Sequence, residues 1–401
     1  MAAPLRLRLL VGGSALSVAV IAGWLVVRNL RAETPTVEFV DVQAYRDELL
    51  AERLEEGDAV EVDDLETLGR QLYLGLIQEV DEDLARKYFA VLKQGRATYV
   101  PGVLFRALPG TNSKRRFKEH PDGRFRRVTN SMGMHEDEDP RDPAPDLRIL
   151  VMGDSHVAGV CSNHESFPTH LESGLAAADP ERSVEVLNLA QGSYDALNYL
   201  GTFRTWGDLE PDVLVLVIYG GNDFRGSLGL GRFLLRRGPA KGLPYQLSVL
   251  NKDRPFGPGL VGQAVGQATF FLANPDEVDL ARDIVAASVL ELAEQARAHD
   301  TQFLVVLLPS PNAGQPQIYL ERVEAAMVRV GADPQGLTVD DRLADGLRAV
   351  LRDRGVEHLD LRPAFRAASQ ALYWNTDLHL NLAGHELVAR EVQIALGQLS
   401  K

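Results

Sequence analysis

The sequence has 401 residues, a hydrophobic fraction of 45% and a formal net charge of −14 at pH 7. The hydrophobic fraction supplies a sizeable core and excludes general disorder, and the acidic balance argues against non-specific binding to nucleic acid. Because Cys161 is the single cysteine, the chain can form neither an internal disulfide nor a cysteine-based metal site.

The first 31 residues contain an uncharged, apolar stretch, residues 9–27, that is about as long as the core of a bilayer requires. Leu30 and Arg31 stand where a cleaved signal peptide would need small residues. We therefore expect residues 1–31 to be an uncleaved signal anchor, a transmembrane helix, rather than a cleaved signal peptide. Such an anchor would attach the protein to a membrane, with its main domain outside the cytoplasm, in the periplasm or at the cell surface.

Residues 32–127 are expected to form an acidic accessory region that is first helical and then irregular or β-rich. Leu68, Leu72, Leu76 and Val80 recur at the spacing of one helix face. Seven basic residues gather near its end. They are either a solvated surface or a contact for lipid head groups or an anionic glycan near the membrane. These residues are Lys114, Arg115, Arg116, Lys118, Arg124, Arg126 and Arg127.

From residue 128 to 401 the pattern alternates between strands and helices, which is typical of a parallel sheet covered by helices. We expect an α/β fold, a flavodoxin-like three-layer αβα sandwich with a five-stranded parallel sheet. A long insertion at residues 224–279 is either a surface excursion or a lid beside a binding site. The predicted strands are residues 148–152, 184–189, 213–219, 303–308 and 356–361.

Polar residues follow several of these strands. Ser155 comes directly after the first strand, Gly192 after the second and Asn222 after the third, while Asp377 and His379 lie near the C-terminus. The loops at the carboxyl ends of parallel strands meet at one edge of a sheet, so we expect these residues to converge.

These residue types suit acyl transfer. A serine hydroxyl needs a neighbouring base to become a nucleophile, and His379 can accept and return its proton. Asp377 can hold the His379 ring in one tautomer. The backbone amides of Ser155 and Gly192 and the side-chain amide of Asn222 can stabilise the oxyanion. His358 and His385 are poorer candidates for the base, because one falls in a predicted strand and the other in the last predicted helix.

The blocks Gly153-Asp154-Ser155, Gly192, Gly221-Asn222-Asp223 and Asp377-x-His379 resemble those of the SGNH, or GDSL-type, hydrolase superfamily. The resemblance covers about residues 128–400 and implies a serine hydrolase with the site residues named above. Two features depart from the common pattern. The family often has Asp-x-x-His instead of Asp-x-His, a shorter spacing that resembles membrane-associated members that modify polysaccharides. His156 stands where an apolar or aromatic residue is often found.

Three functions remain open at this point. The first is a membrane-anchored serine esterase that removes acyl groups, such as acetyl, from a glycan or lipid. The second is an O-acyltransferase that passes the same acyl group to a cell-surface polysaccharide. The third is a non-catalytic scaffold of the cell envelope. No cofactor or metal is expected, because no glycine-rich phosphate loop follows the first strand and the nine histidines show no paired ligand spacing.

Overall fold

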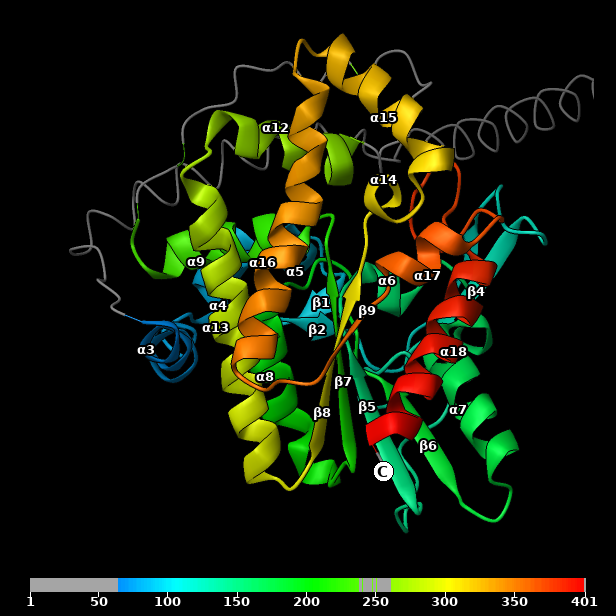
Figure 1. Ribbon diagram of the computed structural model, residues 1–401. Helices are drawn as coiled ribbons and strands as arrows, with labels where there is room; N and C mark the ends of the chain where they lie inside the picture. The colour runs from blue at the N-terminus through cyan, green and yellow to red at the C-terminus, as the bar shows by residue number, and fades with distance from the viewer. Residues whose placement is uncertain (1–63, 238–239, 241–246, 248–249, 251–260, 400–401) are drawn as a thin grey trace, which may run out of the picture. The chain divides into compact units, whose positions relative to one another are not determined.

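The computed structural model describes residues 64–237, 240, 247, 250 and 261–399 (Figure 1). The predicted membrane anchor, residues 1–31, lies outside the described residues. Within the described ranges, no helix is both long enough and apolar enough to cross a lipid bilayer.

A parallel sheet forms the centre of the described chain, with its strands in the order β6-β5-β7-β8-β9. Counted along the chain this is the order 2-1-3-4-5 of flavodoxin-like folds. All residues of β5, β6 and β7 are buried, as expected for strands covered on both faces. The five predicted strands are confirmed as β5 (Leu147–Met152), β6 (Val184–Asn188), β7 (Val213–Tyr219), β8 (Gln302–Leu308) and β9 (His358–Asp360).

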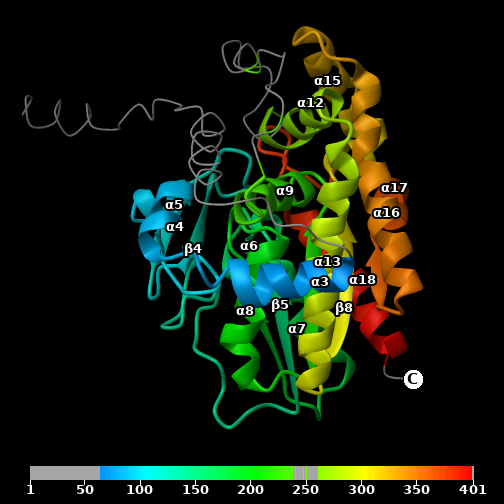
Figure 2. The same ribbon diagram turned by 90° about the vertical axis from the view of Figure 1, so that its left-hand side faces the viewer.

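Helices cover both faces of this sheet (Figures 1 and 2). On one side, α7 (Phe167–Ala178) and α18 (Leu382–Leu399) pack against each other, and α7 also packs on β6. On the other side, α13 (Glu277–Ala298) packs on β8 and contacts both α8 (Ala196–Trp206) and α16 (Val339–Asp353). The sheet with its two helical layers therefore forms the expected three-layer α/β arrangement.

Shorter helices follow the strand ends and fill the loops. The carboxyl ends of β5, β7 and β8 lead into α6 (Ser155–Ala158), α9 (Asp223–Leu234) and α14 (Pro311–Gly314). The others in this part of the chain are α12 (Gly266–Ala273), α15 (Pro316–Arg329) and α17 (Arg362–Ala367), with π-helical residues at Val261–Val265 and 3-10 turns at Asn163–Glu165, Gly207–Leu209 and Pro334–Thr338.

The described part of the predicted accessory region begins with helices, as expected. Leu68 and Leu72 are buried, and the helix around them packs on α13. A Cβ added at Gly69 would lie 2.7 Å from the Ala287 carbonyl oxygen, so the two helices touch backbone to backbone. These N-terminal helices are α3 (Leu65–Arg70), the π-helical Gln71–Leu76, α4 (Glu82–Tyr88) and α5 (Ala90–Lys93).

Two antiparallel strand pairs follow these helices. The first joins β1 (Ala97–Thr98) to β2 (Arg106–Ala107), and the second joins β3 (Asn112–Arg116) to β4 (Arg124–Val128). The β3–β4 hairpin carries the basic run that the sequence analysis singled out.

The ends of the insertion at 224–279 belong to the core. Phe224 and Phe233 of α9 are buried, and so are Gln267 and Phe270 of α12. Most of residues 238–260 lie outside the described residues, so the alternative of a lid over a binding site stays a prediction.

Candidate active site

Ser155 is the first residue of α6, directly after strand β5. Asp154 caps this helix, since its Oδ1 accepts the His156 N–H at 2.8 Å. Burial raises the pKa of the Asp154 carboxyl, and the hydrogen bonds that it accepts oppose this rise. A Cβ at Gly153 would lie 2.3 Å from Val157 Cγ2, so glycine permits the tight turn from strand to helix that places the serine at the sheet edge.

Ser155, His379 and Asp377 form a continuous chain of hydrogen bonds. The His379 Nε2 atom lies 2.7 Å from Ser155 Oγ, and the His379 Nδ1 atom lies 2.5 Å from Asp377 Oδ1. The side chains of His379 and Asp377 are 16% and 29% exposed, so solvent reaches both. The structure thus brings together the three residues that the sequence analysis assigned to the reacting centre.

Leu378 explains how an aspartate and a histidine two positions apart can meet. In an extended strand, residues i and i+2 are about 6.6 Å apart along the chain. Leu378 instead adopts the left-handed conformation, with φ +65°. The turn is closed by the Trp374 N–H, which donates to the His379 carbonyl at 2.8 Å. Asp377 Oδ1 therefore accepts the backbone N–H of His379 at 3.2 Å as well as contacting its ring.

The Asp377 carboxyl stays ionised in this setting. Burial alone would raise its pKa, but hydrogen bonds from the His379 ring and backbone, together with the nearby Arg127 guanidinium, hold the pKa below its usual value. A carboxylate that accepts from Nδ1 fixes the tautomer in which Nε2 faces the serine.

Gly192 and Asn222 lie beside Ser155. A Cβ added at Gly192 would be 3.7 Å from Ser155 Cβ. The Asn222 Nδ2 atom donates to Asp154 Oδ2 at 3.3 Å, which leaves its second N–H for another acceptor. No acceptor within the described ranges takes the backbone N–H of Ser155 or of Gly192. Three donors that the sequence analysis assigned to an oxyanion therefore gather around the serine.

Asp223 braces the loop that carries Asn222. Its Oδ2 accepts the Tyr219 N–H at 2.9 Å and the Tyr199 hydroxyl at 3.2 Å. The side chain is fully buried, and burial followed by the nearby Asp154 raises its pKa well above the usual range. Asp223 is therefore a neighbour of the site that supports its geometry.

His156 is a residue whose place the sequence analysis could not explain. Its ring is fully buried between Tyr219 and His379, with ring centroids 3.7 Å and 4.6 Å away and interplanar angles of 28° in both cases. Burial, then the neighbouring His379 and His385, lower its pKa well below the usual value, so the ring is neutral. This flat neutral ring backs the imidazole of His379. A histidine directly after the serine was the only signal in the sequence.

The other two histidines considered as bases lie elsewhere. His385 is buried, and its Nδ1 accepts the Phe167 N–H at 3.2 Å while its Nε2 lies 3.5 Å from Cys161 Sγ. Burial lowers the pKa of His385 to about 3. His358 lies in β9, and its Nδ1 is 2.9 Å from the Val356 carbonyl oxygen. Neither histidine contacts Ser155.

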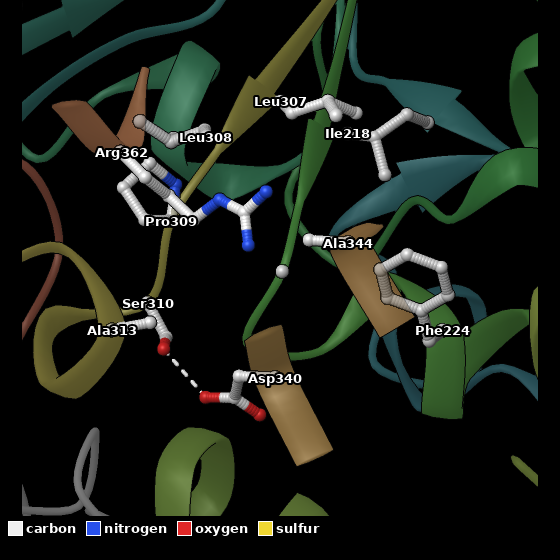
Figure 3. A pocket seen from close by; sticks show the side chains of 11 residues that line it. Ile218, Phe224, Leu307, Leu308, Pro309, Ser310, Ala313, Asp340, Ala344 and Arg362 are labelled. Atoms are coloured by element: carbon white, nitrogen blue, oxygen red, sulfur yellow. Dashed lines mark hydrogen bonds between the residues drawn. The ribbon is translucent and has the colours of Figure 1, made fainter. Parts of the chain in front are cut away.

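A small cavity lies at the carboxyl ends of β7 and β8, lined in part by Gly220 and Phe224 on either side of Asn222 in the sequence (Figure 3). Its free space of about 10 Å³ holds about one water molecule, too little for a substrate. Asp340 lines the cavity and accepts hydrogen bonds from Ser310 Oγ at 2.5 Å, Gln267 Nε2 at 2.7 Å and Asn312 Nδ2 at 3.1 Å. Despite these bonds, burial raises the pKa of Asp340 to about 6.

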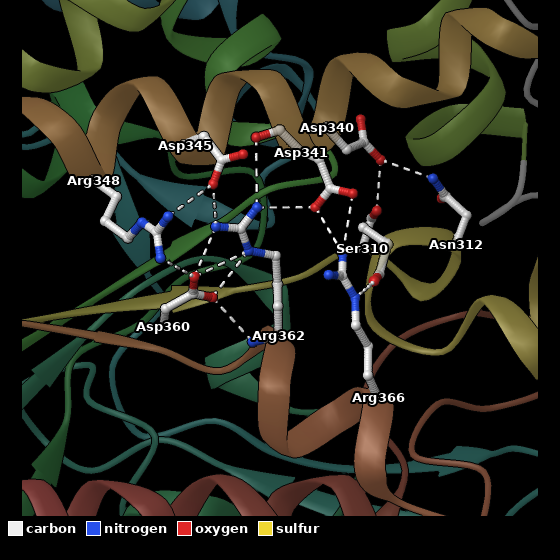
Figure 4. A network of polar contacts seen from close by, with 10 residues as sticks. Ser310, Asn312, Asp340, Asp341, Asp345, Arg348, Asp360, Arg362 and Arg366 are labelled. Atoms are coloured by element: carbon white, nitrogen blue, oxygen red, sulfur yellow. Dashed lines mark hydrogen bonds and ion pairs between the residues drawn. The ribbon is translucent and has the colours of Figure 1, made fainter.

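A network of ion pairs extends from the same cavity (Figure 4). Arg362 donates to Asp360, Asp341 and Asp345, and all three of its guanidinium nitrogens have carboxylate partners. Arg348 lies 3.5 Å from Asp360 and extends the network. Across the part of the chain that the structure describes, no group of three or more His, Cys, Asp or Glu side chains could hold a metal ion.

The solved structures that resemble this chain include esterases and lipases. The acetyl xylan esterase AlAXEase is 15% identical, with a TM-score of 0.38, and the match covers 62% of this chain and 100% of that one. A catalytic mutant of an acetylxylan esterase from Geobacillus stearothermophilus is 13% identical, with a TM-score of 0.37 and coverages of 63% and 94%. A lipase from a goat rumen metagenome is 14% identical, with a TM-score of 0.40 and coverages of 62% and 97%.

No curated protein matches the chain. The family described as "GDSL-like Lipase/Acylhydrolase family" matches residues 151–387, which is more than half of the chain and includes every site residue named above. The protein therefore belongs to the GDSL-like lipase/acylhydrolase family and is an SGNH-type hydrolase that acts on ester bonds.

Proposed function

We propose that the protein is a serine esterase that works through an acyl-enzyme on Ser155. The observation that carries this proposal is the hydrogen-bond chain from Ser155 Oγ to His379 Nε2, 2.7 Å, and from His379 Nδ1 to Asp377 Oδ1, 2.5 Å. A base within hydrogen-bond reach of the serine, and an acid that orients the base, are the two requirements of this chemistry.

In the first half of the proposed reaction, His379 Nε2 takes the proton of Ser155 Oγ as that oxygen attacks the acyl carbon. The carbonyl π electrons move to the oxygen and form a tetrahedral oxyanion. When the intermediate collapses, the bond to the alcohol oxygen breaks and His379 returns the proton to the leaving alcohol. Asp377 stabilises the imidazolium that exists between these two transfers.

In the second half, water replaces the alcohol. His379 takes a proton from water while the resulting hydroxide attacks the acyl-serine carbon. Collapse of the second tetrahedral intermediate breaks the bond to Ser155 Oγ, which regains its proton from His379, and the carboxylic acid leaves. In each half His379 first accepts a proton as a base and then donates it as an acid, so one histidine serves both halves.

The proposed oxyanion site uses the N–H groups of Ser155 and Gly192 and the free N–H of the Asn222 amide. Two observations support this assignment: the donors lie around the serine, and within the described ranges no acceptor takes the two backbone N–H groups. Asp154 holds the Asn222 amide in place before substrate arrives. Loss of one such preorganised donor typically raises the barrier by about 2.7–4 kcal/mol.

The proposed substrate carries a short acyl group, such as acetyl, on a glycan. The large apolar side chains that are exposed within the described ranges are Ile318, Val328 and Ile394, and none belongs to a segment that carries a site residue. A long acyl chain would need an apolar surface beside the serine. The apolar stretch at residues 9–27 supports the further proposal that the enzyme is anchored in a membrane and acts outside the cytoplasm.

Labelling with a fluorophosphonate probe tests the proposal directly, because the probe modifies only an activated serine. We expect the full chain to be labelled and to hydrolyse p-nitrophenyl acetate. Ser155→Ala should abolish labelling and lower kcat by at least about 10,000-fold. Ser193→Ala, a matched change beside Gly192, should leave the labelling intact. A folded Ser155→Ala protein that still turns over the ester would refute the proposal.

A further inference from the structure

The β3–β4 hairpin concentrates positive charge on one face of an acidic protein. The register places Lys114 opposite Arg126 and Arg116 opposite Arg124, and all four side chains are exposed. Side chains directly opposite each other on an antiparallel pair lie on the same face, with Cβ atoms about 5 Å apart. We call these four residues the cationic face.

This arrangement is unfavourable for the hairpin itself, because like charges directly opposite each other destabilise a strand pair. Within the described ranges, none of the four side chains has a carboxylate at ion-pair distance, and the Arg126 guanidinium donates to the amide oxygen of Asn112 at 2.9 Å. Several arginines elsewhere are paired, as Arg148 is with Glu185 at 2.7 Å. Among the residues that the structure describes, the positive charge of the cationic face is therefore uncompensated.

The opposite face of the hairpin packs beside the candidate active site. Phe125 is buried there, and Arg127 Nη2 donates to the Gly159 carbonyl just after α6. The hairpin turn reaches the loop that carries Asp377 and His379. The Glu119 carboxylate accepts the Thr376 N–H at 3.0 Å, and the Phe117 ring meets the Trp374 ring edge-on at 5.2 Å.

Unused donors surround this same loop. Arg127 Nε, Arg322 Nε and Nη2, and Trp374 Nε1 are buried and have no acceptor within the described ranges. Arg322 is fixed to the loop by its Nη1, which donates to Asn375 Oδ1 at 3.0 Å. Buried donors without acceptors are rare, and a ligand rich in oxygen acceptors would satisfy them.

A polymer fits this surface better than a bilayer does. The basic residues of the hairpin are mostly arginines, whose planar forks match planar carboxylates. Binding at a membrane interface also needs apolar side chains that enter the lipid. The exposed large apolar residues of the described ranges lie on α15 and α18 and not on the hairpin itself.

We propose that the cationic face is a docking surface for a carboxylate-bearing polysaccharide, which it guides to the neighbouring serine. This inference rests on the proposed function, and it names the class of substrate: an acylated polyuronate. The cationic face holds sugar carboxylates on one side of the ester that is cleaved, and the unused donors near Trp374 meet the sugar oxygens close to Ser155.

The test compares two double variants of equal charge change in the full chain. Arg116→Gln/Arg124→Gln neutralises one cross-strand pair of the cationic face. Arg342→Gln/Arg352→Gln removes two exposed arginines from α16. Binding to partially acetylated polygalacturonate is measured in the Ser155→Ala background, where no turnover occurs. At low salt we expect the hairpin variant to bind about tenfold more weakly and the α16 variant to bind unchanged. The difference should vanish at high salt.

Two further measurements distinguish a failure of the docking proposal from a failure of the proposed esterase function. Thermal unfolding should show no loss of stability in the hairpin variant, since a repulsive pair is removed. Hydrolysis of p-nitrophenyl acetate by the same variants with Ser155 intact should be unchanged, and its absence in the unsubstituted chain would count against the proposed function alone. Equal polyuronate binding by both variants would overturn the inference. Equal affinity for neutral acetylated xylan would also overturn it, as would hairpin-dependent binding to phosphatidylglycerol vesicles that exceeds binding to the polyuronate.

Discussion

Two pairs of residues in this protein share one local pattern, an aspartate followed two positions later by a basic side chain. In Asp360-x-Arg362 the aspartate accepts the Arg362 backbone N–H at 3.0 Å and its guanidinium. In Asp377-x-His379 the aspartate accepts the His379 backbone N–H at 3.2 Å and contacts its ring. The two pairs make the same local hydrogen bonds but differ in whether the basic side chain keeps a nitrogen for a further partner.

The Arg362 pair is saturated. The Arg362 side chain is 8% exposed, and its guanidinium meets the carboxylates of Asp360, Asp341 and Asp345 (Figure 4). The His379 pair keeps one ring nitrogen for Ser155 Oγ, and its side chains remain partly open to solvent. A charged pair therefore becomes a candidate for chemistry when its remaining hydrogen-bonding capacity is directed at a third, reactive group.

The largest difference between the two pairs is expected in kcat when each aspartate is changed to asparagine. Asp377→Asn should lower kcat on p-nitrophenyl acetate by about 1,000- to 10,000-fold, because the amide no longer enforces the tautomer with Nε2 free to accept. Asp360→Asn should leave kcat per folded molecule unchanged. Steady-state kinetics on both variants measures this, and a large loss of kcat in Asp360→Asn would break the comparison.

The saturated pair is expected to act on stability. Arg362→Met removes the centre of the network and leaves Asp360 with Arg348 alone, at 3.5 Å. The free energy of unfolding should fall by about 2–3 kcal/mol, less than for a fully buried pair because two of the aspartates are exposed. Urea unfolding measures the loss, with exposed Arg342→Met as control. A variant as stable as the parent would show that the network is only a surface feature.

A smaller kinetic effect is expected at His156. His156→Ala removes the ring stacked on His379, so the imidazole gains freedom and kcat should fall about 10- to 100-fold. His156→Phe keeps a flat ring and should restore most of the rate. If alanine and phenylalanine lower kcat equally, stacking is not what His156 contributes. Labelling of Ser155 by the fluorophosphonate probe should follow the same order.

The stability contributions of Asp340 and Asp377 should respond to pH with opposite signs. Burial raises the pKa of Asp340, beside the Arg362 network, from 3.8 to about 6. Its contribution to stability is complete below pH 3.8 and is lost as pH rises through 6. The lowered pKa of Asp377 contributes stability that is lost as pH falls below its usual range.

Asp340→Asn therefore should flatten the decline of stability between pH 4 and pH 7 by up to about 3 kcal/mol, the free-energy equivalent of this pKa shift. Asp377→Asn should affect only the acid side. Chemical denaturation at a series of pH values measures both slopes. An unchanged decline in Asp340→Asn would assign the pH dependence to other buried carboxyls.

Much of this organisation could be predicted from the sequence. The buried runs gave all five strands of the sheet, and the serine and histidine blocks at the strand ends meet as predicted, since a parallel sheet gathers those ends at one edge. The left-handed turn at Leu378 could not be predicted, because leucine rarely adopts this conformation and the tertiary packing of its buried side chain helps to hold it there. The contact of Glu119 with Thr376 could not be predicted either, because tertiary packing brings together positions that are 257 residues apart.

The left-handed turn at Leu378 also has a consequence for how this enzyme could be engineered or could drift. A leucine in this conformation costs about 1 kcal/mol relative to glycine or asparagine, and the buried side chain compensates for the cost by filling the core. Glycine or asparagine at this position would relieve the backbone strain but would remove the buried leucine side chain and leave a cavity. Position 378 is thus a place where the stability of the fold and the geometry of Asp377 and His379 depend on the same side chain.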